Sequence, residues 1–359
     1  MNIGLVGLPR SGKTTVFQAL VGPDTIGPIR PNQPHRAVVN VPDPRVQALT
    51  DLYQSKKVVA ATIQYIDLPG VPVEQADRQG LPEEHLRQLG QVDALLAVIG
   101  AFEARAATPL DIDAQLESIH LELLLSDMQK TENRLEKARK TVMKVVGAEK
   151  QALQNELAVL ERVHAALNDN TAIRELELRD QEQKITRGFQ FLSEKPILYL
   201  ANIGEESLAD TEQALKPLAA HAARPRAMSG WICAQVELEL ALLSGEDRQT
   251  FMADYGIESL AAQRLIRRCY ELMDYITFFT SAEKETHAWT VTRGTKAPHA
   301  AGVIHSDFER GFVRAAAVSV DDLIDCGSTA AARKAAKLRL EGKGYSIQDG
   351  DVIEFLFSV

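Results

Sequence analysis

Residues 7–15, GLPRSGKTT, decide the fold of this chain, because they combine two glycines, a lysine and a threonine at a fixed spacing. The spacing G-x-x-x-x-G-K-T is that of a phosphate-binding loop, in which backbone N–H groups point at phosphate oxygens. Lys13 is expected to reach the β- and γ-phosphates, and the Thr14 hydroxyl is expected to ligate Mg²⁺. An apolar strand is expected at 3–6 and a helix at 14–20. The sequence therefore predicts a nucleotide-binding loop between a strand and a helix.

The composition is that of an ordinary globular protein of two or three domains. The 359 residues are 45% hydrophobic and 25% charged, and the formal net charge of −9 argues against a surface that coats a polyanion. Three widely spaced cysteines, Cys233, Cys269 and Cys326, have neither metal-ligand nor disulfide-scaffold spacing, which indicates a reducing compartment. Because no apolar run reaches the ~18 residues of a membrane span and no signal peptide is evident, we expect a cytoplasmic protein.

The spacing of apolar residues and turn signals divides the chain into three regions. Over residues 1–110, short apolar runs alternate with helical or Gly/Pro-rich segments, which predicts parallel βα units. Between 113 and 187, apolar residues recur at three- and four-residue spacing, and Gly147 interrupts the pattern. We expect two antiparallel helices there, as a projecting hairpin or as an ordinary packed pair. The predicted strands beyond the first lie at 61–66, 94–99 and 197–201.

The last 80 or so residues alternate short strands with turn signals around one helix, which predicts a small α+β module. Its strands are expected at 288–292, 312–318 and 352–357, and its helix at 329–340. The stretch 331–343 carries five basic residues and one acidic residue. On a helix, Arg333, Lys334 and Lys337 would share a face, as a phosphate-contacting surface or as a solvated charged one.

Asp67 ends the second apolar strand and opens the sequence Asp67-Leu68-Pro69-Gly70. At this place, next to a phosphate loop, the carboxylate can hold Mg²⁺ through water, and the Gly70 N–H can contact a γ-phosphate. Val71 follows at the position where Ras-like GTPases carry the glutamine that orients the attacking water. An aliphatic side chain cannot orient water, so the sequence predicts slow hydrolysis or the use of another group.

Polar residues also occur in the segments expected to switch. His35, Arg36 and His85 are interpreted as solvated loop residues rather than as catalysts.

Asn202, Ile203 and Glu205 follow the strand expected at 197–201. Guanine readers usually carry Asn-Lys-x-Asp here, and the chain lacks that sequence throughout. Ile203 stands in place of the lysine, and the longer Glu205 stands in place of the aspartate. Because adenine lacks the two donors that the aspartate would bind, the sequence favours ATP over GTP. Asn202 can also be interpreted as a simple strand-end turn residue.

Over essentially its full length the chain resembles the YchF-type Obg-like ATPases, a family of translation-factor-class P-loop NTPases. The resemblance rests on the loop GLPxxGKTT, on Asn202-x-x-Glu205 and on the stretch 288–312, which is similar to a ubiquitin-like TGS domain. Further matching strings are VPDPR (41–45), DLPG (67–70), RLEGK (339–343) and QDGD (348–351).

The resemblance implies a fold and a division into domains. The fold would be α/β: a P-loop G-domain with an inserted antiparallel helical hairpin and a C-terminal α+β β-grasp (TGS) domain. The domain boundaries would be 1–120 and 188–275 for the two parts of the G-domain, 121–187 for the hairpin and 276–359 for the TGS domain.

The resemblance also implies ATP binding and hydrolysis with Mg²⁺, with Thr14 and Asp67 (through water) on the metal, and association with the ribosome. A monomer is expected, with no membrane partner and no sequence-specific DNA. The residues that match the family's phosphate loop are Pro9, Arg10, Ser11, Gly12, Lys13, Thr14 and Thr15. Asn202, Ile203 and Glu205 match its base-reading loop, and Cys233, Ala234 and Gln235 its second base-contacting loop.

Two departures from the family pattern leave alternatives open. The family usually carries Asn and Val where this chain has Arg10 and Ser11, and a Phe-x-Thr-Ile segment whose Thr completes the Mg²⁺ shell is missing from 27–36. Arg10 could act as an arginine finger in cis, making Arg10 and Lys13 the catalytic candidates, or point into solvent. The alternatives to a slow ATPase are a hydrolysis-impaired nucleotide-sensing protein and a GTP-specific Obg-like GTPase.

Overall fold

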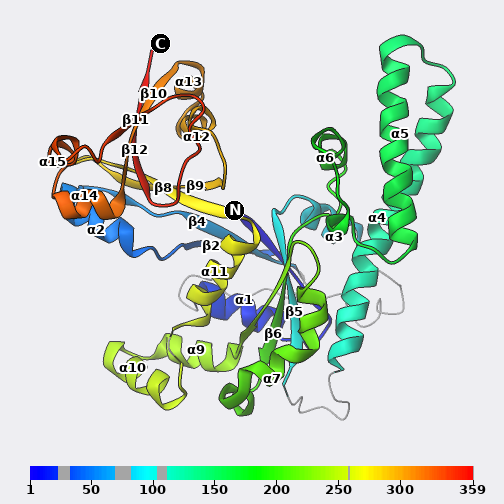
Figure 1. Cartoon of the computed structure of the whole chain (residues 1–359). Coiled ribbons are helices and arrows are strands. Elements are labelled where there is room, and N and C mark those ends of the chain that lie inside the picture. The colour runs from blue at the N-terminus through cyan, green and yellow to red at the C-terminus, as the bar shows by residue number, and fades with distance from the viewer. Residues whose placement is uncertain (23–32, 69–81, 103–110, 258, 359) are drawn as a thin grey trace. The chain divides into compact units, whose positions relative to one another are not determined.

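A computed structural model of the chain describes residues 1–22, 33–68, 82–102, 111–257 and 259–358 (Figure 1). The chain divides into two compact units. The first comprises Met1–Val38 and Gln64–Arg268, and the second comprises Val39–Ile63 and Cys269–Val359. In the described residues, no helix is both long and apolar enough to cross a membrane.

The first unit is built on a six-stranded sheet with the order β2-β4-β1-β5-β6-β7. The pairs β1–β4, β1–β5, β5–β6 and β6–β7 are all parallel. Such strands are covered on both faces and therefore read as continuous apolar runs rather than as alternating ones. The strands are β1 (Asn2–Val6), β2 (His35–Asn40), β4 (Thr62–Asp67), β5 (Ala94–Ala101), β6 (Ile197–Ile203) and β7 (Ala227–Ile232).

The strands predicted from apolar runs in this unit are confirmed, each to within two residues at its ends. Every residue of β6 is buried, and so are seven of the eight residues of β5. Helices between the strands complete a parallel α/β fold, in which the carboxyl ends of the strands form one edge of the sheet and the amino ends form the other. The helices outside the hairpin are α1 (Lys13–Val21), α3 (Glu83–Gly90), α7 (Thr211–Leu215), α8 (Ala219–Ala222), α9 (Ala234–Leu242), α10 (Gly245–Asp254) and α11 (Ala261–Leu272), with 3₁₀ turns at Ile173–Glu175, Glu205–Asp210 and Lys216–Leu218.

The helical hairpin predicted between residues 113 and 187 is present. Helix α4 (Ile112–Val142) and helix α5 (Gly147–Asn168) are joined by a short turn, and α6 (Asp180–Arg187) follows (Figure 1). Gly147, with φ +65°, starts α5 and adopts a backbone conformation that costs glycine little. Boundaries of the hairpin at 121 and 187 stay predictions.

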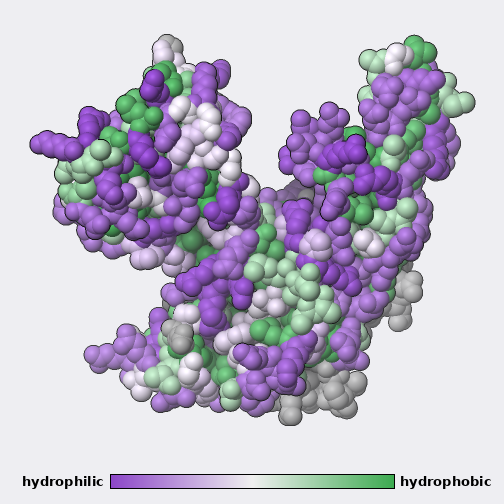
Figure 2. Space-filling model, in the orientation of Figure 1, coloured by the Kyte–Doolittle hydropathy of each residue, from purple (hydrophilic) through white to green (hydrophobic). Residues whose placement is uncertain are grey.

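The hairpin is packed at its base and exposed at its tip. Leu135, Leu160 and Val163 belong to one buried cluster near the base. Met143 and Val146, in the turn, are 84% and 83% exposed. Figure 2 shows hydrophilic residues along the sides of the hairpin and hydrophobic ones at its free end. The hairpin therefore extends beyond the core that anchors it.

The second unit contains another six-stranded sheet, with the order β11-β10-β12-β8-β9-β3. The antiparallel pair β8–β9 is followed by helices and then by the antiparallel pair β10–β12, and β12 runs parallel to β8. This is the arrangement expected of a β-grasp module. The elements are β3 (Val58–Val59), β8 (Tyr275–Ser281), β9 (Thr286–Thr292), α12 (Ala297–Ile304), α13 (Ser306–Arg310), β10 (Phe312–Ser319), α14 (Val320–Cys326), α15 (Thr329–Lys334), β11 (Arg339–Glu341) and β12 (Asp351–Phe357).

Residues 39–63 belong to this second unit, which the sequence did not indicate. Helix α2 (Pro44–Tyr53) has Asp43 as its N-cap, and the cap residue accepts a hydrogen bond from the backbone N–H of Arg45. The Arg45 guanidinium lies 2.8 Å from an oxygen of Asp349. The Tyr53 and Thr329 hydroxyls lie 2.7 Å apart. These bonds attach a segment that is early in the sequence to the C-terminal module.

The predicted helix at 329–340 is wrong in its second half. Helix α15 ends at Lys334, Ala336 has φ +56°, and residues 339–341 form strand β11. Lys337 lies outside the helix and pairs with Asp322 at 3.0 Å. Alanine-rich sequence favours a helix locally, but pairing with β10 decides the outcome here. Arg333, Lys334 and Lys337 therefore do not share a helical face.

Candidate nucleotide-binding site

The loop 7–15 joins the carboxyl end of β1 to helix α1. A Cβ on Gly7 would lie 2.8 Å from both the Ser11 hydroxyl and the Val98 carbonyl oxygen. Gly12 has φ +81°, and a Cβ there would collide with the Asn202 amide. Both glycines of the motif are therefore required by the close packing of the loop against β5 and β6, as well as by phosphate binding.

Arg10 has φ +72°, in the left-handed region that non-glycine residues rarely adopt. Asparagine tolerates this conformation better than arginine does, so the residue that the family usually carries suits the backbone better. Arg10 is exposed, and its side chain makes no hydrogen bond or ion pair with the described residues. Its predicted catalytic role thus stays a prediction.

The two residues predicted to hold Mg²⁺ lie together. The Thr14 hydroxyl donates to one oxygen of Asp67 at 3.0 Å, and the Lys13 ammonium contacts the other oxygen and the Leu68 carbonyl. Asp67 is only 1% exposed and ends β4, which lies next to β1. A hydroxyl and a carboxylate are hard oxygen donors of the kind that Mg²⁺ prefers, so these residues fit the ion.

Two histidines flank this cluster, which corrects their interpretation as solvated loop residues. His35 opens strand β2, and its Nδ1 lies 3.8 Å from an Asp67 oxygen. His85 is 9% exposed within helix α3. Burial lowers the pKa of His85, and the charge of Lys13 lowers it further. Arg36 is exposed, but on strand β2 rather than in a loop.

A cavity of about 350 Å³ opens beside the loop 7–15, at the carboxyl ends of β5 and β6. It brings together Thr15 and all six residues predicted to contact the base, which come from two separate parts of the sequence. Such a position is where ligands bind in open α/β sheets. The complete lining is Gly12, Thr15, Phe102, Asn202, Ile203, Gly204, Glu205, Glu206, Cys233, Ala234, Gln235 and Val236.

The Asn202 side chain connects three segments of the site. Its amide nitrogen donates to the Ser11 carbonyl at 3.1 Å, and its oxygen accepts from the Ala234 backbone N–H at 3.3 Å. Asn202 is 5% exposed. With both ends of the amide already bonded, the side chain ties the phosphate loop to the two predicted base loops.

Glu205 is exposed and accepts a hydrogen bond of 2.6 Å from the Tyr255 hydroxyl. This bond raises the pKa of Tyr255. Cys233 is buried, and burial raises the pKa of its thiol. Both residues therefore contribute shape and polarity rather than a reactive group.

Sequence reasoning missed Phe102, Gly204, Glu206 and Val236, which also line the cavity. Phe102 directly follows β5, so its place at the carboxyl edge could have been inferred from the strand alone. The predicted switch residues Gly70 and Val71 lie outside the described residues, and so does part of the segment 27–36, from which the switch threonine is missing.

Comparison with known proteins connects this site to a family. The chain is 37% identical over 368 residues to the ribosome-binding ATPase YchF of Bacillus subtilis (strain 168), and the alignment covers 100% of both chains. It is 35% identical over 366 residues to the ribosome-binding ATPase YchF of Escherichia coli O157:H7, covering 99% of each. The chain belongs to the YchF family of ribosome-binding ATPases.

The fold agrees with YchF membership. The structure of the Schizosaccharomyces pombe YchF GTPase matches with a TM-score of 0.83 at 28% identity, covering 99% of this chain and 97% of that one. Residues 2–131 match the family model described as "50S ribosome-binding GTPase". Residues 275–358 match the YchF C-terminal model, described as "Protein of unknown function (DUF933)". The predicted fold class is thus confirmed as a P-loop G-domain followed by a C-terminal YchF domain.

Proposed function

We propose that this chain binds ATP with Mg²⁺ at the loop 7–15 and hydrolyses it slowly, as a conformational switch on the ribosome. The observation that carries the proposal is the convergence of Lys13, Thr14 and Asp67 beside the 350 Å³ cavity. A phosphate chain lying along the loop would point its nucleoside end toward Asn202 and its γ-phosphate toward Asp67. This geometry supports the proposal of a nucleoside triphosphate site.

Each residue has a separate task in this proposal. The backbone of the loop and Lys13 hold the β- and γ-phosphates, and Asn202 keeps the loop and the base cavity in register. Thr14 and Asp67 would hold Mg²⁺, which when bound neutralises phosphate charge. Among the described residues, no group of three His, Cys, Asp or Glu could hold a metal alone. The nucleotide's own phosphate oxygens are therefore expected to complete the ligand set.

ATP is proposed over GTP because position 205 carries the longer glutamate, and its carboxylate accepts a hydrogen bond from the Tyr255 hydroxyl. Competition between ATP and GTP for the purified chain tests this choice, with Lys13→Ala as the binding-deficient control. ATP is expected to displace a fluorescent nucleotide at lower concentration than GTP. A clear preference for GTP would refute the choice and favour the GTPase alternative.

A second candidate function is nucleotide sensing without significant turnover. The sequence supports it, because Val71 replaces the water-orienting glutamine and the usual switch threonine is missing. Phosphate release measured with and without ribosomes separates the two functions. Sustained turnover above the buffer rate would exclude pure sensing, and its absence under both conditions would exclude the ATPase.

Ribosome binding is proposed for this chain because its relatives carry the name ribosome-binding ATPase. We also propose that the chain works as a cytoplasmic monomer, that its C-terminal module is a TGS domain and that it reads no DNA sequence. Cosedimentation with ribosomes, with and without ATP, tests the partner. Failure to pellet with ribosomes in either state would contradict it.

A further inference from the structure

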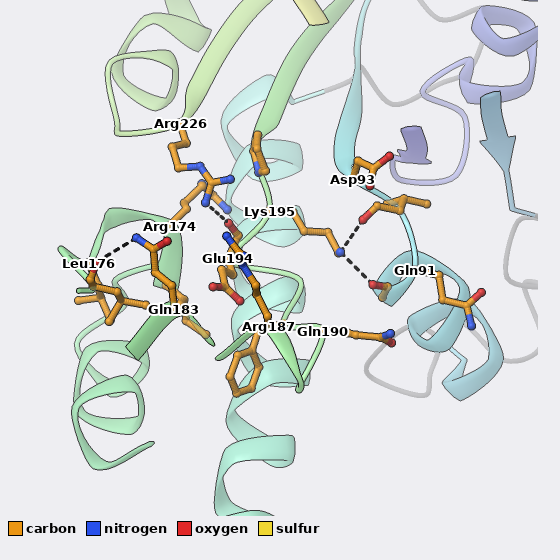
Figure 3. Close-up of a pocket in the computed structure, with 16 residues that line it drawn as sticks. Gln91, Asp93, Arg174, Leu176, Gln183, Arg187, Gln190, Glu194, Lys195 and Arg226 are labelled. Carbon is orange, nitrogen blue, oxygen red and sulfur yellow. Dashed lines mark hydrogen bonds between the residues drawn. The ribbon is translucent and has the colours of Figure 1, made fainter. Parts of the chain in front are cut away.

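A larger cavity, of about 530 Å³, lies at the opposite edge of the first unit's sheet (Figure 3). Three of its lining residues lie at the amino ends of parallel strands: Asp93 directly precedes β5, Arg226 directly precedes β7, and Lys195 lies one residue further from the start of β6. The candidate nucleotide site lies at the carboxyl ends of the same strands. The second cavity is therefore separate from the nucleotide site, and none of the motifs in the sequence covers it.

Positive charge dominates the lining. Four basic side chains line the cavity against two acidic ones, so four minus two leaves an excess of two positive charges. This excess contrasts with the net charge of −9 for the whole chain. The basic residues are Arg174, Arg187, Lys195 and Arg226, and the acidic ones are Asp93 and Glu194.

Both carboxylates are already engaged on other groups. Asp93 accepts the backbone N–H of Asn2 at 2.7 Å. Glu194 accepts the Thr186 hydroxyl at 2.6 Å. These donors are neutral and leave both carboxylate charges in place, so the two acids reduce the four positive charges to an excess of two.

Arg174 is an unusual residue in this lining, because it is only 4% exposed. Its guanidinium donates to the Ser193 carbonyl at 3.2 Å and to the Tyr199 hydroxyl at 3.4 Å, both of which are neutral oxygens. Its Nε is buried, with no hydrogen-bond partner in the part of the chain that the structure describes. The charge of the Glu175 carboxylate acts on Arg174, but no hydrogen bond joins it to the buried Nε. A buried cation with an unused donor is costly unless an anion binds it.

Two further guanidinium groups approach Arg174 around Glu194 (Figure 3). Burial lowers the pKa of Arg226 against the opposing effect of Glu194, and the charges of Arg174 and Arg187 lower it further. Arg226 donates only to the Glu194 carbonyl, at 3.1 Å, among the described contacts. Three arginines so close together repel one another, and a shared anion would remove that repulsion.

We propose that this cavity binds a small phosphate-bearing metabolite, whose phosphate is held between Arg174, Arg187 and Arg226. A phosphate monoester carries about −1.5 to −2 charges at pH 7, which matches the excess of two positive charges. Planar guanidinium groups bind phosphate oxygens in pairs. The 530 Å³ volume has room for more than the phosphate, and Leu176 and Phe191 give part of the wall an apolar character.

Calorimetric titration of the full chain tests the proposal, after Mg²⁺ and a non-hydrolysable ATP analogue have filled the loop 7–15. Ribose 5-phosphate is the probe, and ribose is the uncharged control. Ribose 5-phosphate is expected to bind saturably and ribose to show no binding. Arg187→Gln and Arg226→Gln are each expected to weaken binding about tenfold or more, the usual effect of losing a charge-assisted hydrogen bond.

Arg179→Gln is the matched control, because it removes the same charge from an exposed residue just before the helix that carries Arg187. It is expected to change affinity by less than about twofold. The proposal is overturned if ribose 5-phosphate does not bind saturably, if ribose binds equally well, or if both pocket variants bind like the wild type. Binding of a short single-stranded RNA without binding of ribose 5-phosphate also overturns it. The comparison of the two probes needs no variant, so it stands even if a substitution prevents folding.

Discussion

Each edge of the first sheet carries a cavity for which we propose a phosphate-bearing ligand, but the residues of the two cavities are distributed differently along the sequence. At the carboxyl edge, the residues predicted to bind phosphate lie within nine consecutive positions, 7–15. At the amino edge, Arg174, Arg187 and Arg226 are separated by stretches of unrelated sequence. In a phosphate loop, backbone N–H groups of neighbouring residues make most of the hydrogen bonds to the phosphates. The residues of such a loop must therefore be contiguous in the sequence. Side chains that bind alone need no such continuity.

The largest expected effect is a loss of nucleotide affinity at the carboxyl edge that leaves ligand binding at the amino edge unchanged. Lys13→Ala removes the ammonium that would reach the β- and γ-phosphates, so nucleotide affinity is expected to fall by about a hundredfold or more. Binding of ribose 5-phosphate at the amino edge is expected to stay within about twofold. Titrations with an ATP analogue and with ribose 5-phosphate measure the two effects.

Lys216→Ala is the control, because Lys216 is a lysine of the same unit that donates to Gln213 at 2.6 Å, outside the linings of both cavities. It is expected to leave both affinities unchanged. If Lys13→Ala weakened both ligands equally, the two edges would not be independent sites.

Asn202→Ala tests whether the hydrogen bonds of the Asn202 amide hold the loop 7–15 and the segment at Ala234 together. The substitution leaves the buried Ser11 carbonyl and Ala234 N–H without their partner, which is expected to cost about 1–3 kcal/mol in the free energy of unfolding. Nucleotide affinity is expected to fall as well, because the loop loses its alignment with the base cavity. Urea denaturation and nucleotide titration measure the two quantities.

Asn155→Ala removes an exposed amide on helix α5 and is the matched control. A change within about 0.5 kcal/mol is expected there. An Asn202→Ala variant as stable as this control would show that the two hydrogen bonds of the Asn202 side chain contribute little to the free energy of unfolding.

Arg10→Gly tests the backbone of the loop. Because Arg10 has φ +72°, glycine is expected to relieve strain and stabilise the chain by up to about 1 kcal/mol. Arg10→Ala tests the side chain: if Arg10 acts as an arginine finger, hydrolysis falls sharply in this variant. Thermal unfolding and phosphate release measure the two effects. Unchanged hydrolysis in Arg10→Ala would remove Arg10 from the catalytic candidates.

The smallest expected effect concerns pH. Burial and the charge of Lys13 lower the pKa of His85, so the unfolded chain, with a pKa near 6.5, takes up its proton at higher pH than the folded chain. Stability is therefore expected to fall as the pH drops below about 6.5, until the folded pKa is reached. His85→Gln is expected to flatten this slope, as measured by denaturation between pH 7 and 5. The exposed His299 serves as control, and an equal flattening in His299→Gln would contradict the assignment.

The carboxyl edge was largely predictable from sequence. Lys13 and Thr14 are set by a local motif, and Asp67 follows from the rule that parallel strands end at the same edge. The structure added the tie made by Asn202, whose two partners lie 191 and 32 residues away along the chain. Phe102 belongs to no motif and was missed, although its position directly after β5 places it at the carboxyl edge.

The other two differences between the sequence-based predictions and the structure share one physical cause. Residues 331–340 are rich in alanine and basic residues, which predicts a helix, but pairing of 339–341 with β10 ends it early. Helix α2 precedes β4 in sequence, yet Arg45 and Tyr53 bond to residues of the C-terminal module. Long-range pairing overrides local preference in both places, and a single sequence does not display it.

The resemblance of its motifs to a known family indicated the class of NTPase. By local pattern, the sequence determined the phosphate loop and four of the six strands of the first unit's sheet. These depend on local spacing and on the 2.0 and 3.6 residue periods of strands and helices. Only the tertiary structure decided that residues 39–63 belong to the second unit, and that three distant arginines meet at the amino edge. The three arginines come close to one another because of the way β5, β6 and β7 are aligned. That alignment is set by the burial of side chains across the whole core.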